Sequence, residues 1–137
     1  MDKKGLLRVL DANFNRSKEA LRVIEDIFRF VSDNDKLRKK ARTLRHSLDE
    51  ITKNKLFKEA VKSRNSVYDL GRKIDALELN RKTSRDILYA NLQRAKESVR
   101  VLEEFFKIIS PSQVKLLKKI RYDIYSLEKK IYIYKEG

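Results

Sequence analysis

The sequence contains no cysteine and no tryptophan, and among its 137 residues only one is proline and three are glycine. Without cysteine, the chain can have neither a disulfide framework nor a thiolate nucleophile or metal ligand. The scarcity of proline and glycine, together with heavy use of Lys, Glu, Leu and Ile, favours long helices over strands and tight turns. We therefore expect an all-α fold, built as a helical bundle.

Long apolar runs are also missing, since no stretch approaches the roughly 18 apolar residues of a membrane span. The first residues, MDKKGLLRVLDAN, are too polar for a signal peptide. These features predict a cytoplasmic protein that makes no use of a membrane. The length suits a single domain that folds around one core.

Acidic residues are few relative to basic ones, and the formal net charge is +14. Such a charge favours an anionic partner or substrate, and nucleic acid, anionic lipid and phosphorylated metabolites all fit that description. A solvated lysine-rich surface without any partner is the alternative. The known phosphate-loop, dinucleotide, zinc-protease and hydrolase motifs are absent from the sequence.

What the sequence does contain is an internal repeat. Residues 10–30 read LDANFNRSKEALRVIEDIFRF, and residues 88–108, which lie 78 positions later, read LYANLQRAKESVRVLEEFFKI. The identical pairs include Leu10/Leu88, Ala12/Ala90, Asn13/Asn91, Arg16/Arg94, Lys18/Lys96, Glu19/Glu97, Arg22/Arg100, Val23/Val101 and Glu25/Glu103. Chance does not produce this agreement, so we infer a duplication.

Helical spacing of apolar residues extends the repeat to a helical hairpin in each half. The first hairpin covers about 6–52, a linker covers 53–82, and the second hairpin covers about 83–135. The predicted core positions are Leu10, Phe14, Leu21, Ile24, Phe28, Val31, Leu37, Ala41, Leu44, Leu48 and Ile51, then Ile87, Leu88, Leu92, Val99, Leu102, Phe106, Leu117, Ile120, Ile124, Leu127, Ile131 and Tyr134. Two such hairpins are expected to pack as a four-helix arrangement with pseudo-two-fold symmetry.

The linker and the turns add detail to this plan. Within the linker, KLFKEAVK is typical of a short helix, and SRNSVYDLGRK contains turn-forming residues. The second helices of the two hairpins align with an offset of 76, which places Arg45 on Arg121 and makes the second hairpin's turn about two residues shorter.

Two polar residue types recur at the apolar stripe of the first helix in each hairpin. At 100° per residue, Asn13 lies inside the stripe and Arg16 on its border, and Asn91 and Arg94 repeat these places. Burying an amide or a guanidinium is costly unless each finds a partner. The repetition indicates either an anion site between the hairpins, built from arginine and asparagine donors, or a duplicated polar cluster of purely structural value.

Other charged residues allow more than one interpretation. Glu25 and Glu103 lie on the other border of the stripe, where each could order an arginine or hold Mg²⁺. Arg22 and Arg100 lie on the polar face, each with acids three residues before and four after, as expected of surface ion pairs. His46 is the only histidine, and its position beside the core seam favours a structural role.

The two repeat segments, together with LRHSLDE, SRNSVYDLG and KKIRYDIYSLE, resemble the helical domain that precedes thiamine-phosphate synthase in some fused proteins. That family is identified as the hydroxymethylpyrimidine-phosphate kinase of thiamine biosynthesis. The resemblance covers nearly the whole chain, although Ala20 stands where we expect glycine and Arg72 where threonine is common. The synthase itself is not implied, because 137 helical residues cannot supply a barrel of about 200 residues or more.

The resemblance implies phosphorylation of hydroxymethylpyrimidine phosphate to the diphosphate, with ATP and Mg²⁺. A phosphate acceptor is already largely ionised at neutral pH, because its second pKa is about 6, so the enzyme needs cations and alignment instead of a general base. On this hypothesis Arg16, Arg94, Arg45 and Arg121 are phosphate clamps, and Asn13 and Asn91 are orienting donors. Glu25 and Glu103 are further substrate-site candidates, and the 63–71 loop is a lid with Arg64 on a phosphate and Asp69 on Mg²⁺.

A second hypothesis is a non-catalytic basic module that binds nucleic acid or a separate thiamine-phosphate synthase. Its support is the net charge and the tyrosines among lysines near the C-terminus. Nucleic acid is the less favoured partner, because several of these tyrosines alternate with core positions. The expected partners are therefore the pyrimidine phosphate and ATP, with a separate synthase or a second copy of the chain as further candidates.

Overall fold

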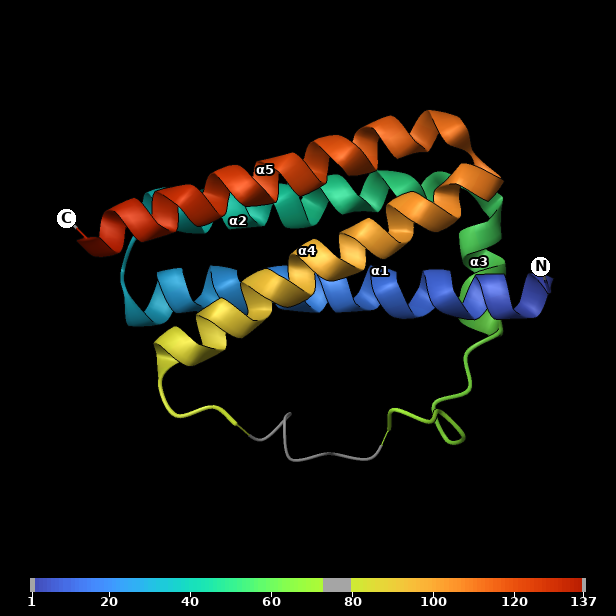
Figure 1. Cartoon of the computed structure of the whole chain (residues 1–137), viewed down its shortest axis with the longest axis horizontal. Coiled ribbons are helices and arrows are strands. Elements are labelled where there is room, and N and C mark those ends of the chain that lie inside the picture. The colour runs from blue at the N-terminus through green and yellow to red at the C-terminus, as the bar shows by residue number, and fades with distance from the viewer. Residues whose placement is uncertain (1, 73–79, 137) are drawn as a thin grey trace.

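The computed structural model describes residues 2–72 and 80–136, and all the regular structure in these ranges is helical (Figure 1). In chain order the elements are α1 (Lys3–Asp26), the π-helix η1 (Ile27–Val31), α2 (Asp35–Ser47), the 3₁₀ helix η2 (Leu48–Lys53), α3 (Lys55–Lys62), α4 (Ser84–Ile109) and α5 (Pro111–Glu136). The expected all-α bundle is confirmed, and the short helix predicted for KLFKEAVK is α3.

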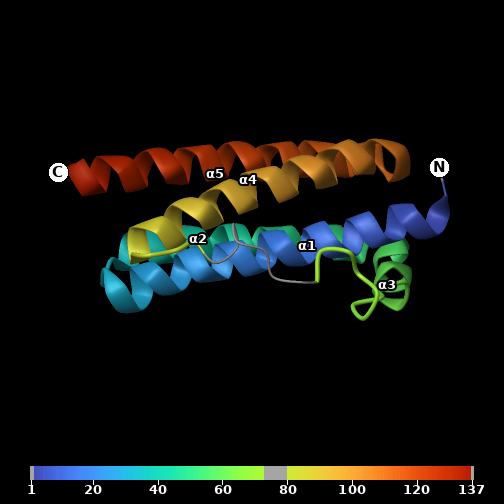
Figure 2. The same ribbon diagram turned by 60° about the horizontal axis from the view of Figure 1, so that its bottom comes forward.

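The helices pair as two hairpins that pack on one another. α1 packs against α2, and α4 packs against α5. Between the hairpins, α4 crosses α1 obliquely and α5 lies along α2, while α3 stands across one end of the bundle (Figures 1 and 2). No helix in the described part of the chain combines the length and the apolar character needed to span a bilayer.

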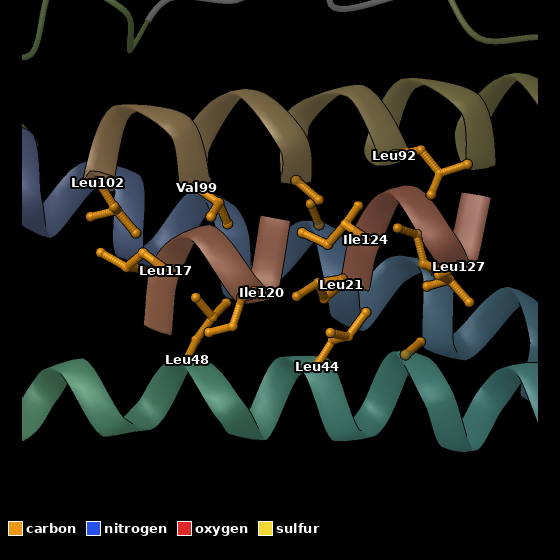
Figure 3. Close-up of a cluster of buried hydrophobic side chains, with 14 of the residues drawn as sticks. Leu21, Leu44, Leu48, Leu92, Val99, Leu102, Leu117, Ile120, Ile124 and Leu127 are labelled. Atoms are coloured by element: carbon orange, nitrogen blue, oxygen red, sulfur yellow. The ribbon is translucent and has the colours of Figure 1, made fainter. Parts of the chain in front are cut away.

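Leucine and isoleucine side chains from all four long helices fill the core (Figure 3). Leu44 of α2 and Leu48 of η2 point towards Ile120 and Ile124 of α5, and Leu21 of α1 lies in the same cluster (Figure 3). The core positions predicted for α2 and η2, from Leu37 to Ile51, are all buried. The periodicity therefore identified the packed faces correctly.

Three predicted core residues, Val31, Ile87 and Tyr134, are exposed. Ile87 is 37% exposed because it lies in the first turn of α4, and the buried face of that helix begins at Leu88. Val31 is 61% exposed because it ends η1, where the wider π turn rotates the following side chains away from the α-helical stripe. Tyr134 is 48% exposed, so the core seam of α5 ends at Ile131. Here the helix continues beyond the part of α2 that could cover it.

The two hairpin turns differ, as the change of offset predicted. Three residues, 32–34, separate η1 from α2, whereas Ser110 alone separates α4 from α5. Asp33 adopts a left-handed backbone with φ of 48°, and the Asn34 N–H donates to the Phe28 carbonyl at 2.8 Å. The first turn therefore combines a π-helix with a left-handed residue, and the second has neither among its described residues.

The second hairpin begins at a capping box. The Thr83 hydroxyl accepts a hydrogen bond from the Asp86 N–H at 3.1 Å, and the Asp86 carboxylate accepts from the backbone N–H groups of Thr83 and Lys82. The hydrogen bond from the Lys82 N–H is the main reason that the pKa of Asp86 lies below its ordinary value. This cap fixes where α4 starts, and therefore the register in which it crosses α1.

Candidate functional site

A cleft of about 610 Å³ lies where α4 crosses α1, and the two repeat copies line it in pairs. The pairs are Asn13/Asn91, Arg16/Arg94, Glu19/Glu97, Ala20/Ser98 and Val23/Val101, and Gly71 from the linker completes the lining. The two members of each pair are 78 residues apart in the sequence. The cleft, which we call the repeat cleft, therefore lies at the pseudo-two-fold axis of the duplication, and the N-x-x-R motifs meet there.

The two asparagines are held in the same way. Asn13 Nδ2 donates to the Val9 carbonyl at 2.9 Å, and Asn91 Nδ2 donates to the Ile87 carbonyl at 2.8 Å. Both side chains are buried, and each bond runs back four residues along its own helix. The amide nitrogen is thus anchored to the backbone, which fixes the direction of the amide oxygen.

The two arginines of the cleft are exposed instead of buried. Arg16 Nη1 donates to the Asn13 amide oxygen at 3.4 Å. Neither Arg16 nor Arg94 forms an ion pair with any described residue. The cleft thus presents two guanidinium groups that carry no acidic partner, which is the arrangement expected of an anion site.

The carboxylates of Glu19 and Glu97 line the same cleft. From the sequence, we expected Arg22 and Arg100 to pair with the acid three residues before and the acid four residues after. The structure confirms the pair with the later acid, at 3.3 Å between Arg22 and Asp26 and at 3.2 Å between Arg100 and Glu104, and not the pair with Glu19 or Glu97 among the described residues. The clue in the sequence was that both glutamates are identical between copies, although each lies on the polar side of its helix.

Glu25 and Glu103 each order an arginine from the neighbouring helix. Arg45 Nε lies 3.1 Å from Glu25 Oε1, and Arg121 Nε lies 2.5 Å from Glu103 Oε2. Both carboxylates are almost fully buried, and the bond to Glu103 raises the pKa of Arg121. Of the two roles left open by the sequence, ordering an arginine is the one that the geometry supports.

These pairs leave Arg45 and Arg121 outside the repeat cleft. Arg45 lines a separate pocket between α1 and α2. The Arg121 guanidinium lies near the rings of Tyr122 and Tyr125, at 5.2 and 5.7 Å from their centroids, and donates to the Tyr125 hydroxyl. The structure therefore does not bring the four predicted clamp arginines to one place.

Arg64 and Asp69 also lie beside the cleft instead of in it. The Arg64 guanidinium donates two hydrogen bonds of 2.7 Å to the carboxylate of Asp11 in α1, and this partner raises the pKa of Arg64. Asp69 Oδ1 accepts from the Gly71 N–H at 2.7 Å. Both line a small pocket of about 190 Å³ next to α1, and the linker reaches the repeat cleft through Gly71. The placement of Asp69 on Mg²⁺ stays a prediction.

No group of three or more histidine, aspartate or glutamate side chains in the described ranges could hold a metal by itself. Magnesium in phosphoryl-transfer sites does not require such a group, because one or two carboxylates, water and substrate phosphates complete its shell. The pair of carboxylates in the repeat cleft, from Glu19 and Glu97, matches that donor set.

The fold and the cleft define an all-α domain with a duplicated N-x-x-R motif, and comparison with known proteins gives its family. The model of the ThiD2 family matches residues 8–130, so the chain belongs to the ThiD2 family. No solved structure matches the chain.

Several curated relatives are named thiamine-phosphate synthase. The protein of Synechocystis sp. is 36% identical over 90% of this chain and 35% of its own length, and that of Prochlorococcus marinus strain AS9601 is 38% identical over 90% and 34%. The Gloeobacter violaceus protein is 30% identical over 93% and 37%. The chain thus spans about a third of the length of the curated relatives that it matches.

Proposed function

We propose that the protein is an enzyme of thiamine biosynthesis that transfers the γ-phosphoryl group of ATP to hydroxymethylpyrimidine phosphate, giving the diphosphate and ADP. The observation that carries this proposal is the pairing of the two N-x-x-R motifs across the repeat cleft. Both substrates of this reaction carry phosphate groups, and the duplication supplies two similar anion-binding edges. Membership of the ThiD2 family and the names of the relatives support the pathway.

The reaction makes few chemical demands on the protein. An oxygen of the acceptor phosphate attacks the γ-phosphorus, and the bond to the β,γ-bridging oxygen breaks, so that ADP leaves with the electron pair. The attacking oxygen is already ionised, because the second pKa of a phosphate monoester is about 6. The protein must therefore hold two anions in line, which Arg16 and Arg94 do with planar, permanently charged groups.

Charge balance assigns a role to the glutamates. Two arginines and two glutamates leave the repeat cleft without net charge, yet the two substrates together bring several negative charges. Magnesium supplies the missing positive charge when it binds, and Glu19 and Glu97 are the residues that would hold it beside the phosphates. The arginines then remain free to contact the phosphate oxygens.

The asparagines position these arginines. Asn13 is anchored to the Val9 carbonyl and accepts from Arg16, so its oxygen limits where the guanidinium can lie. A clamp that is pre-oriented loses less conformational entropy on binding than a free arginine does. We assign Asn91 the same function for Arg94, because its backbone anchor is the same.

The direct test incubates the purified protein with hydroxymethylpyrimidine phosphate, ATP and Mg²⁺ and measures the pyrimidine diphosphate by mass spectrometry. We expect product that depends on all three components and falls at least a hundredfold in the Arg16→Ala/Arg94→Ala double variant. A folded protein that forms no diphosphate under saturating substrates would contradict the assignment.

The relatives favour a second candidate function, association with a separate thiamine-phosphate synthase. In the relatives that are named thiamine-phosphate synthase, the matched region makes up about a third of the protein. A helical domain of this kind could therefore bind a synthase that is a separate chain. Co-elution with a thiamine-phosphate synthase in size-exclusion chromatography tests this candidate, and separate elution at micromolar concentrations would exclude a stable complex.

A further inference from the structure

A second polar pocket, of about 620 Å³, lies in the first hairpin between α1, η1 and α2. It shares no lining residue with the repeat cleft. Its permanently charged cations are five arginines, Arg22, Arg29, Arg38, Arg42 and Arg45. We call it the arginine pocket, and nothing in the function proposed above uses it.

The choice of arginine is selective. The chain contains 14 arginines and 20 lysines, but no lysine is among the residues that line this pocket. The lysines of the same helix α2, Lys36, Lys39 and Lys40, line a different groove together with α5. A guanidinium offers parallel N–H donors that match two oxygens of one phosphate, whereas an ammonium acts as a point charge. The lining is therefore suited to phosphate groups specifically, and not only to negative charge.

Ion pairs account for three of the five arginines. Arg45 is paired with the buried Glu25, and Arg38 Nε lies 2.8 Å from Asp35. Arg22 is paired mainly with Asp26 at 3.3 Å. These pairs hold the floor and the walls of the pocket in place before any ligand arrives.

Arg29 and Arg42 have no acidic partner among the described residues. Both side chains are exposed, and the Arg29 guanidinium lies 4.8 Å from the centre of the Phe30 ring. The five arginines lie with the lining carboxylates of Glu25, Asp33 and Asp35 and with Asp26, the partner of Arg22, so these groups together carry one positive charge. The guanidinium groups of Arg29 and Arg42 are the two that no carboxylate of the described residues holds, and they are free to bind a ligand.

The duplication shows that the fold does not require this arrangement. With the offset of 76, Val114 replaces Arg38, Lys118 replaces Arg42 and Tyr122 replaces His46. In the second hairpin, the rings of Tyr122 and Tyr125 lie over the equivalent of Arg45, which is Arg121. The buried glutamate–arginine pair is thus common to both halves, while the arginine-rich wall is present only in the first.

The turn beside the pocket is also particular to the first hairpin. The π-helix η1 carries Phe28 and Arg29 into the pocket lining, and the left-handed Asp33 follows it. π turns and left-handed non-glycine residues are less stable than a regular helix end and are often found at functional sites. Both features therefore lie close in sequence to Arg29, the unpaired arginine of η1.

We propose that the arginine pocket is a second ligand site, which binds a phosphorylated small molecule through a diphosphate group. Two unpaired guanidinium groups on a pocket of this volume suit a ligand with two linked phosphates better than a single phosphate. The site is separate from the repeat cleft, so a compound bound there can act as an effector without competing for the substrates. This inference does not depend on the kinase proposal.

Isothermal titration calorimetry with inorganic pyrophosphate tests the site directly. The titration uses the Arg16→Ala/Arg94→Ala protein, so that the repeat cleft does not contribute. In this background we compare Arg29→Gln/Arg42→Gln with Lys107→Gln/Lys118→Gln, which removes the same two charges at the equivalent positions of the second hairpin. We expect at least a tenfold loss of affinity in the first pair and less than a threefold change in the second.

Two results would overturn the proposal. Equal losses in both pairs would show attraction to net charge only, and undetectable pyrophosphate binding in the Arg16→Ala/Arg94→Ala protein would show that no second site exists. Circular dichroism verifies that each variant is folded, and the single variant Arg42→Gln, which retains Arg29, serves as the test if the double variant is not. That single variant should lose at least threefold in affinity, and an unchanged affinity would count against the site.

Discussion

Glu103 illustrates how a single residue in this protein can be structural although its spacing suggests a site. Its carboxylate is buried and bonded to Arg121, whereas the next residue, Glu104, is exposed and pairs with Arg100 and Lys107. The two neighbours therefore differ in environment and not in chemistry. Their comparison separates a buried ion pair from surface ion pairs.

We expect Glu103→Gln to lower the free energy of unfolding by about 3–5 kcal/mol, because it leaves the Arg121 guanidinium without a charge partner in a largely buried place. Glu104→Gln should change stability little, since exposed pairs contribute little. Urea unfolding followed by circular dichroism measures both. Equal effects of the two substitutions would show that burial of the Glu103 pair does not matter.

The sequence singled out some of the residues that line the repeat cleft and missed others for a definite reason. Asn13 and Arg16 were found because a polar residue inside an apolar stripe is conspicuous at the helical period. Glu19 was missed because it lies further around α1 on the polar side, and only the oblique crossing of α4 brings that side against its own copy. The spacing of apolar residues defines the buried face of one helix, but it does not give the crossing angle between two helices.

At the scale of elements, the helices were predictable and their ends only in part. The capping box of α4 is readable from Thr83 and Asp86, and the break at Ser110 and Pro111 from composition. The π-helix η1 could not be predicted from the sequence, because its residues IFRFV continue the apolar pattern of α1 and no local residue marks the wider turn. The exposure of Val31 follows from that turn.

Thr83→Ala should destabilise the protein by about 1 kcal/mol, the usual cost of losing an N-cap side chain. The neighbouring Ser84→Ala is the matched control, because Ser84 lies within the helix and does not make the capping bond. Thermal unfolding of both variants checks this. Similar melting temperatures for the two would mean that the capping box does not stabilise α4.

The same cap predicts a pH dependence. The folded-state pKa of Asp86 lies below the ordinary value of 3.8, so the charged carboxylate stabilises the fold above that pH. As pH falls from about 4 through the lowered pKa, this contribution is lost. The stability difference between the parent and Asp86→Asn should therefore be full at pH 7 and shrink towards pH 2. A difference that is constant over this range in urea titrations would contradict the assignment.

The linker segment 63–72 is tied to α1 by Arg64 and reaches the repeat cleft at Gly71. Chymotrypsin should cleave the free protein after the exposed Tyr68, and more slowly when ATP, Mg²⁺ and the pyrimidine phosphate fill the cleft. Asp11→Asn weakens the anchor and should speed cleavage. A rate that does not change with saturating ligands would remove the linker from any role as a lid.

At the scale of the whole molecule, duplication both builds the fold and places the site. Two hairpins that each expose an apolar stripe cover one another, and the residues beside those stripes then meet at the axis between them. The net charge of +14 is compatible with this account but does not specify it. The arginines that have no acidic partner among the described residues indicate the site more specifically than the net charge does.

The two halves of the molecule differ at the repeat cleft and at the arginine pocket. Ala20 and its counterpart Ser98 both line the repeat cleft, and the Ser98 hydroxyl donates to the Arg94 carbonyl at 2.6 Å. Outside it, the arginine pocket belongs to the first hairpin. On the function proposed above, this divergence distinguishes the two copies of the motif, each of which binds a different substrate.

Steady-state kinetics of Arg16→Ala, Arg94→Ala and the double variant test the central claim most directly. Each single variant should lose at least a hundredfold in kcat/KM, equal to about 2.7 kcal/mol, because a charge-assisted clamp on the transferred group is removed. The KM for ATP should rise mainly in one variant and the KM for the pyrimidine phosphate in the other. The double variant should lose less than the product of the single losses, since both arginines act on one transition state. If the folded single variants bind both substrates and turn over like the parent, the repeat cleft is only a record of duplication and packing, and the account is wrong.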